Sequence, residues 1–228
     1  MASEETDFKN AGRFAKGATG ARYMPRPYGL ATGKHLSKST RAGIVDLPTG
    51  KWVIRLDNAH KGVNTPHINI NPKLTGVKDP HIPIPGSLVK GGEMATKAFN
   101  VIGKAAFVVA LAADAYQLGK AIHNDCTKTK KKLPGKRTAK VAASVAGGWA
   151  GGCAGAAAGS STGAYIGGAI GAAFGGVGAV PGAALGSLIG AVVGGVGGGV
   201  GGSCATEAVV KELVSSDSEE DEKEENSM

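Results

Sequence analysis

Hydrophobic and polar residues alternate along residues 51–57 and again along residues 67–71, which predicts two β-strands. The first stretch, KWVIRLD, places its larger apolar side chains on one face and Arg55 and Asp57 on the other, outward face. The connection NAHKGVNTP between the two stretches is polar and contains glycine and proline. We therefore expect a β-hairpin with a long loop, followed by a proline-rich segment that cannot form a regular central strand.

A helical pattern replaces this alternation at residues 92–126, where alanine is frequent and apolar residues recur three or four positions apart. Lys104 and Asp114 leave only nine uncharged residues between them. Since a membrane span needs about 20 apolar residues, this pattern predicts a helix that packs in protein or at an interface.

Glycine then recurs at every fourth position through residues 141–206. Each glycine inside a helix costs about 1 kcal/mol relative to alanine, so the pattern needs a compensating gain. In lipid, small residues at this spacing let two helix backbones approach closely and gain dispersion contacts. The packing residues that we predict are Gly147, Gly151, Gly155, Gly159, Gly163, Gly167, Gly171 and Gly175 in the first arm, and Gly182, Gly186, Gly190 and Gly194 in the second.

This segment is long enough for two membrane spans, and Pro181 with its neighbouring glycines predicts the bend between them. We therefore predict a glycine-zipper helical hairpin, its arms packed on each other or on neighbouring copies. Two alternatives remain open. The segment could be a low-complexity linker, or a soluble hairpin that folds on the 92–126 helix and inserts only on a trigger.

Charge is divided by region. Residues 1–140 carry 24 Lys and Arg against 9 Asp and Glu, residues 141–206 carry no charge, and residues 207–228 carry 2 basic and 9 acidic residues. The basic part favours anionic partners such as RNA or lipid headgroups, although lysines in loops also keep a surface soluble. The amino terminus, MASEETDFKN, is too polar for a signal peptide.

These patterns predict an α+β fold with a membrane-type all-α part. The expected regions are a basic flexible arm (1–46), a His/Arg β-hairpin module (47–91), a helix (92–126), a basic linker (127–140), the glycine-zipper hairpin (141–206) and an acidic disordered tail (207–228). Because both flanks of a hairpin lie on one side of the bilayer, the positive-inside rule predicts that both are cytoplasmic.

The β-hairpin module collects side chains suited to phosphodiester chemistry. Histidine exchanges protons near neutral pH, and arginine stabilises a phosphate in the transition state. The candidate catalytic residues are Arg55, His60, His67 and His81. A metal site through the three histidines is an alternative, but their spacing matches no zinc motif, so no metal or other cofactor is predicted. Polar structural roles and ligand binding without chemistry are the remaining interpretations.

Two stretches resemble known families. LPTGKWVIRLDNAHKGVNTPHININPKLTGVKDPHIPIP is similar to small domains near the ends of bacterial polymorphic and contact-dependent toxins, including Rhs-type proteins. ALAADAYQLGKAIHND followed by AASVAGGWAGGCAGAAAG resembles the glycine-zipper segments of such proteins and of some animal relatives. The first resemblance implies a metal-independent RNase activity.

The function that we predict is membrane association by the glycine zipper, with insertion or homo-oligomerisation in a bilayer and a toxin- or defence-like role. One alternative is an RNase-like module tethered to a membrane, which leaves enzymatic activity uncertain. The other is a membrane-anchored protein that binds RNA or another anionic partner.

Overall fold

The computed structural model describes residues 2–33, 36–128, 135–173 and 176–225. Its strands are β1 (Tyr28–Thr32), β2 (Thr40–Asp46), β3 (Trp52–Asp57), β4 (His67–Ile70) and β5 (Ile82–Pro83). Its helices are α1 (Ala2–Tyr23), α2 (Pro72–Thr75), α3 (Gly86–Lys128), α4 (Lys136–Ala172) and α5 (Ala179–Glu225). The fold is α+β, as the sequence predicts.

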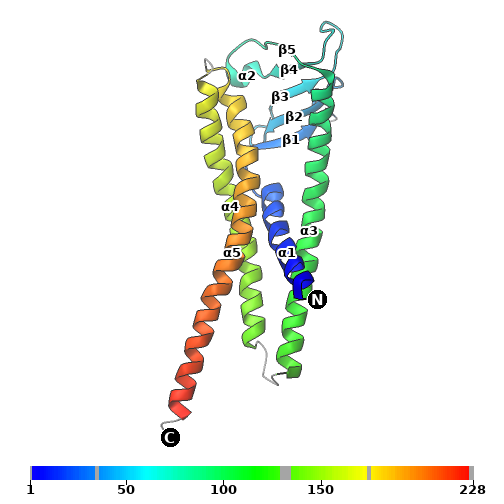
Figure 1. The fold of residues 1–228 in the computed structure, drawn as a ribbon. Helices are drawn as coiled ribbons and strands as arrows, with labels where there is room; N and C mark the ends of the chain where they lie inside the picture. Colours follow the sequence, from blue (N-terminus) through cyan, green and yellow to red (C-terminus); the bar gives the residue numbers. More distant parts are fainter. Residues whose placement is uncertain (1, 34–35, 129–134, 174–175, 226–228) are drawn as a thin grey trace.

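The five strands form one antiparallel sheet in sequence order. The sheet lies at one end of the long helices, between α3 and the paired helices α4 and α5 (Figure 1). Ile44 and Val53 pack on Ala184 of α5 to form a small core, and Leu56 contacts the backbone of α3 at Gly92. The sheet is therefore held between two helical surfaces, and both contribute to its packing.

The predicted flexible arm, residues 1–46, is wrong for the described residues. It folds into α1 and the first two strands of the sheet. The apolar pattern of α1 is weak because its buried positions are small or polar, such as Ala15, Thr19 and Ala21. Such a helix gains little from burying large side chains, and it is stabilised by close backbone packing.

The glycines of α4 and α5 face each other along the whole hairpin. At each of the paired positions, an added Cβ would lie under 3.0 Å from the opposite helix or the turn that leads into it, in most cases from a carbonyl oxygen, closer than real Cβ contacts. The facing pairs are Gly147–Gly202, Gly151–Gly198, Gly155–Gly194, Gly159–Gly190, Gly163–Gly186, Gly167–Gly182 and Gly171–Gly178. Each step of four residues forward along α4 is matched by a step of four residues back along α5, so the register is constant over all seven pairs.

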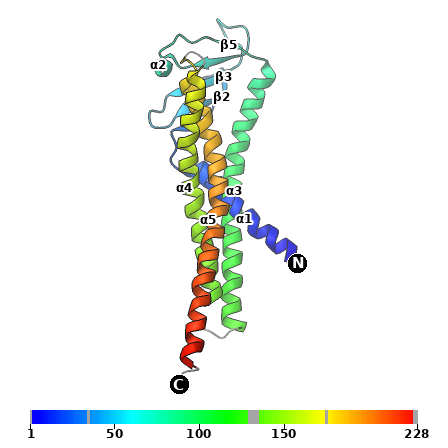
Figure 2. The same ribbon diagram turned by 60° about the vertical axis from the view of Figure 1, so that its left-hand side comes forward.

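A second row of small residues runs beside the facing glycines and carries α1. Gly17 of α1 packs on the backbone at Gly195, and Gly20 packs on Gly152. Buried serines continue this row, and Ser160 and Ser187 share a hydrogen bond of 2.7 Å between α4 and α5. Figure 2 shows α1 crossing the middle of the hairpin. Three helices therefore approach one another through small side chains.

A buried ion pair fixes α1 in this position. Lys16 Nζ lies 2.5 Å from Asp114 Oδ1 of α3, and the Lys16 side chain is 3% exposed. Trp149 Nε1 of α4 donates a hydrogen bond of 2.7 Å to the other oxygen of Asp114. Lys16 passes along Gly148, which has no side chain to obstruct it. One carboxylate thus links α1, α3 and α4.

The sequence predicts the bend at Pro181, but the connection between the two helices lies about one helical turn earlier in the chain. Helix α4 ends at Ala172, and Gly176 adopts a positive φ of 81° before α5 begins at Ala179. Pro181 lies in the first turn of α5, where its missing N–H has no intrahelical partner to lose. The predicted packing residue Gly175 lies outside the described residues.

Two other predicted boundaries move. Helix α3 begins at Gly86 instead of residue 92, and α5 continues to Glu225 through most of the predicted disordered tail. A helix that has already formed extends readily through glutamate and lysine, because propagation is easier than nucleation. Of the predicted basic linker (127–140), residues 129–134 lie outside the described residues, and most of the remainder belongs to the helices α3 and α4.

Three described helices are long and apolar enough to cross a membrane by length and composition: Gly86–Thr127, Lys136–Ala172 and Ala179–Leu213. The first of these helices, Gly86–Thr127, has the length and composition of a membrane span, whereas the sequence analysis predicts a helix that packs in protein or at an interface. Its central charge, Asp114, is satisfied by Lys16 and Trp149 within the protein.

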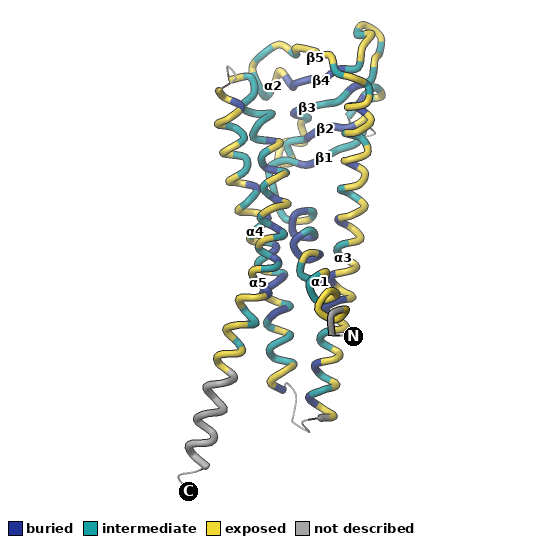
Figure 3. Tube along the Cα trace, viewed as in Figure 1, coloured by how far each residue is buried: buried dark blue, intermediate teal, exposed yellow. Residues whose placement is uncertain are grey.

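Between residues 141 and 206 the described part of the hairpin exposes seven large apolar side chains: Tyr165, Ile166, Ile170, Leu185, Ile189, Val192 and Val193. Figure 3 shows exposed residues along the outer edge of α4 and at the same level of α5. We call these seven residues the outer face of the hairpin.

Candidate functional site: the histidine cluster of the sheet

Antiparallel pairing of β2, β3 and β4 brings the polar residues of the sheet together. Asp57 pairs with Thr40 on one side and with His67 on the other. Arg55 pairs with Asn69 in the next row. Directly paired residues of antiparallel strands lie about 5 Å apart, with side chains on the same face. The register therefore builds one cluster from residues far apart in sequence.

Asp57 lies at the centre of this cluster and is fully buried. Its Oδ1 accepts a hydrogen bond of 2.6 Å from Thr40, and its Oδ2 accepts one of 2.8 Å from Asn69 Nδ2. Arg55 Nη2 lies 3.4 Å from the same Oδ2, and the Arg55 guanidinium lies 4.2 Å from the Trp52 ring centre. The carboxylate is thus held in one orientation.

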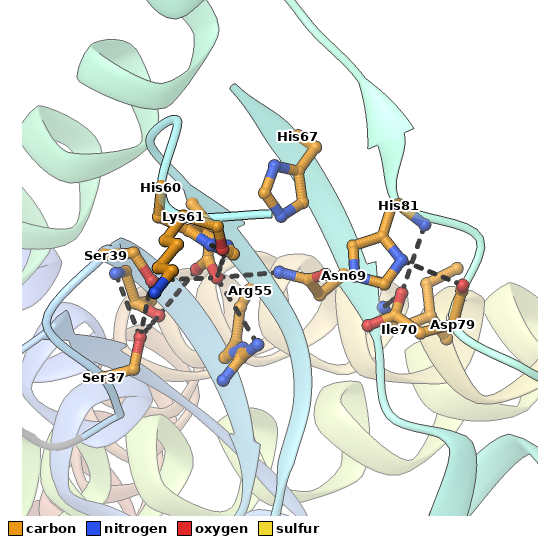
Figure 4. Close-up of polar contacts among 12 residues, drawn as sticks. Ser37, Ser39, Arg55, His60, Lys61, His67, Asn69, Ile70, Asp79 and His81 are labelled. Carbon is orange, nitrogen blue, oxygen red and sulfur yellow. Dashed lines mark hydrogen bonds and ion pairs between the residues drawn. The ribbon is translucent and has the colours of Figure 1, made fainter. Parts of the chain in front are cut away.

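The three histidines lie in a row, with His67 between His60 and His81 (Figure 4). The ring centres of His60 and His67 are 5.0 Å apart, and those of His67 and His81 are 5.3 Å apart. His60 comes from the loop after β3, where a pair of backbone hydrogen bonds with Val63 closes a turn. His81 has a positive φ of 45°, which is uncommon for a side chain of this size.

Each imidazole has its Nδ1 within hydrogen-bond distance of a backbone carbonyl. The partners are Lys61 at 3.1 Å for His60, Thr65 at 2.8 Å for His67 and Asp79 at 3.1 Å for His81. A carbonyl can only accept, so each Nδ1 carries the proton. In the neutral ring, Nε2 is then the acceptor nitrogen.

The polar face of the hairpin is buried, which corrects the expectation that it points outward. His67 and Asp57 are 0% exposed and Asn69 is 1% exposed. Arg55 and His60 keep 20% and 34% of their side-chain surface. The cluster therefore opens to solvent at His60 and Arg55, and His81 at its other end is exposed.

The structure thus brings together all four predicted catalytic residues, in a cluster that also contains residues the sequence did not assign to the site. Asp57, Asn69 and Thr40 complete it. Period-two alternation already placed Asp57 beside Arg55 on one face, whereas Thr40 belonged to the presumed arm. Only the strand register shows that Thr40 and His67 flank the carboxylate.

Acid–base cleavage of RNA needs a histidine that touches the substrate. His67 is buried and cannot reach a polynucleotide in this conformation, whereas His60 and Arg55 can. The RNase interpretation predicts RNA cleavage by the full chain in EDTA, lost in Arg55→Ala, with His123→Ala on exposed α3 as a control. Intact RNA after incubation with the wild-type chain in EDTA would contradict it.

The fold and this site define an α+β protein in which a small antiparallel sheet with a buried Asp–His cluster packs on a glycine-lined helical hairpin. The family described as the C13G5.2-like N-terminal domain matches residues 12–102, which span most of α1, the sheet and the start of α3. Every residue of the cluster lies in this region, and the hairpin lies outside it.

A Caenorhabditis elegans protein described as uncharacterized protein C13G5.2 is 39% identical over 83 residues, which are 35% of this chain. The chain covers 23% of the length of that relative. No solved structure matches the chain. Neither name carries an activity, so the resemblance to bacterial toxins stays a prediction.

Proposed function

We propose that the protein associates with membranes and that its α4–α5 hairpin enters the bilayer. The observation that carries this proposal is the outer face, where seven large apolar side chains are exposed on a hairpin without a charged residue between residues 141 and 206. A soluble monomer rarely exposes a large contiguous apolar patch, and such patches mark interaction surfaces.

Lipid is the partner that this composition favours. The facing glycines already fill the interior of the hairpin, so its outer face is free to contact acyl chains. Both flanks lie at one end of the hairpin, where Lys140 is 3.6 Å from Glu207. This arrangement agrees with a hairpin that enters and leaves on the same side, which the positive-inside rule makes the cytoplasmic side.

In this proposal, the structure described above is the covered form of the hairpin, in which α1 packs against it. Helix α1 places Lys9, Arg13 and Lys16 along one side of the hairpin. Charged side chains are costly at the bilayer centre. Full insertion therefore requires α1 to leave the hairpin, and the sheet to leave its contact with Ala184 near the turn. This two-state behaviour corresponds to the soluble resting state that the sequence left open.

A homo-oligomer would not use the facing glycines, because they are occupied within one chain, and the outer face is the apolar surface of the hairpin that it could use. A toxin- or defence-like purpose rests on the sequence resemblance alone. RNA or another anionic partner remains an alternative partner for the basic region.

The proposal predicts that one charge on the outer face abolishes membrane binding. Ile189 is 65% exposed near the middle of the hairpin. Replacing it by glutamate should weaken partition into phosphatidylcholine–phosphatidylserine vesicles by more than about a hundredfold, since a carboxylate costs roughly 3–4 kcal/mol more than isoleucine at the bilayer centre. Vesicle flotation and resistance to carbonate extraction measure the effect.

Leu47→Glu is the matched control. Leu47 is 48% exposed on the turn between β2 and β3, so the substitution adds the same charge away from the hairpin. The control variant should float with the vesicles as the wild type does. Equal flotation of Ile189→Glu and wild type, or no flotation of the wild type, would overturn the proposal.

A further inference from the structure

We propose that Asp57, His60 and His67 form a binding site for one divalent transition-metal ion of the zinc class. This site is independent of membrane association. It lies within residues 12–102, which match the C13G5.2-like N-terminal domain family.

Unpaired acceptors are the first reason. Within the cluster, the acceptors His67 Nε2 and Asn69 Oδ1 are buried without a hydrogen-bond partner among the described residues, as is the donor Arg55 Nε. Such groups are rare, because an unsatisfied buried acceptor costs about 1–3 kcal/mol. Asn69 cannot be turned round to relieve this, since its Nδ2 donates to Asp57. A cation satisfies lone pairs that no nearby donor reaches.

The tautomers of the histidines are the second reason. His60 and His67 both hold their Nδ1 proton on a backbone carbonyl, which leaves Nε2 free to bind an ion. A histidine that ligates a metal usually donates its other N–H in this way, and the bond fixes the orientation of the ring.

Geometry is the third reason. One ligand atom from each of the three residues lies within 4.8 Å of the others, and His60 Nε2 is 3.9 Å from Asp57 Oδ2. Ligand atoms around zinc at its usual bond lengths are roughly 3.4 Å apart. A movement of up to about 1.4 Å therefore closes the site, and His60 can supply most of it because it lies in a partly exposed loop.

The ligand set indicates the class of ion. Two imidazole nitrogens and one carboxylate suit zinc and its first-row neighbours better than magnesium or calcium, which prefer oxygen alone. Asp57 already has Thr40 and Asn69 as hydrogen-bond partners that orient it. Ser39 Oγ donates a third, longer bond of 3.4 Å to Oδ2. A carboxylate has about four lone-pair positions, so these three bonds leave one position for the ion.

The ion would compete with Arg55, whose guanidinium lies 3.4 Å from Asp57 Oδ2. That distance is longer than a good charge-assisted hydrogen bond, and the guanidinium also stacks on Trp52. Entry is open on the other side, where His60 lines a shallow pocket together with Ser39 and Lys61. The fourth coordination position of the metal would face this pocket and hold water.

Direct metal binding tests the site. The full chain, stripped with EDTA and kept in detergent, is titrated with Zn²⁺ by calorimetry and with Co²⁺ by absorption. We expect one equivalent to bind, and His60→Ala and Asp57→Asn to weaken binding by more than about tenfold, since even losing an orienting partner costs 10–100-fold. His60→Ala removes a partly exposed loop side chain, so its fold, checked by circular dichroism, should be retained.

Two controls separate this site from other ligands. His123→Ala removes an exposed histidine on α3 and should leave binding unchanged. The free cysteines Cys126, Cys153 and Cys204 would give bound Co²⁺ a thiolate charge-transfer band that a nitrogen and oxygen site lacks. Absence of stoichiometric binding, binding unaffected by His60→Ala, or a thiolate band would each overturn the proposal.

Discussion

Leucine at both Gly163 and Gly167 is expected to separate α4 from α5 and destroy the hairpin. A Cβ at either position would meet the carbonyl of Gly186 or Gly182 far inside van der Waals contact. Backbone cannot rotate away as a flexible side chain can, so the helices must move apart along their length. Overpacking costs about 1–3 kcal/mol at each site, or roughly 2–6 kcal/mol for both.

Gly197→Leu with Gly201→Leu is the control for this experiment. These glycines are also four residues apart in α5, but an added Cβ there has nothing within 4 Å. Leucine has the higher helix propensity, so the control should be as stable as the wild type or up to about 1 kcal/mol per site more stable. Thermal unfolding followed by circular dichroism measures both. Similar melting of the two double variants would show that the facing glycines do not hold the hairpin.

Lys16→Met is the second substitution with a large expected effect, and it should release α1. It leaves Asp114 buried against Trp149 without its cation, and removing one partner of a buried pair costs about 3–5 kcal/mol. Denaturant unfolding should show this loss. If the described form is the covered form, the same variant should float with vesicles more completely than the wild type.

Lys16→Met combined with Asp114→Asn is the matched rescue. The amide is neutral, nearly the size of the carboxylate, and can still accept the hydrogen bond from Trp149. Most of the lost stability should return, and vesicle binding should fall towards the wild-type level. A Lys16→Met variant as stable as the wild type would contradict the role of this ion pair. Reduced stability with unchanged flotation would mean that α1 stabilises the fold but does not keep the hairpin from the membrane.

The elements with a clear period were predictable from the chain alone. Strands β3 and β4 follow from the alternation around Arg55 and His67, and α3, α4 and α5 follow from helical spacing. Helix α1 and strands β1 and β2 were missed because patterns of small and polar residues carry little periodic signal. The burial of α1 depends on glycines in distant helices, and that of Ile44 in β2 depends on Ala184 of α5, which a local window cannot show.

The candidate site was likewise predictable from the sequence only in part. The sequence indicates that Arg55, His60, His67 and His81 belong to one polar module, because they are close in the chain and share a strand face or a loop. Only the sheet shows that Asp57 lies between Thr40 and His67, and that the polar face is buried. Burial changes the chemistry that we propose, since an ion reaches His67 and a polynucleotide does not.

The chain by itself determined where backbones can approach closely, because a missing Cβ is a local property of each glycine. It also determined where charge is absent. Tertiary structure decided which backbones meet: α4 faces α5 through the glycines in one register, and α1 covers the adjacent row through Gly17 and Gly20. The physical reason is that periodicity fixes the face of a helix, whereas the partner of that face depends on contacts between residues far apart in the chain.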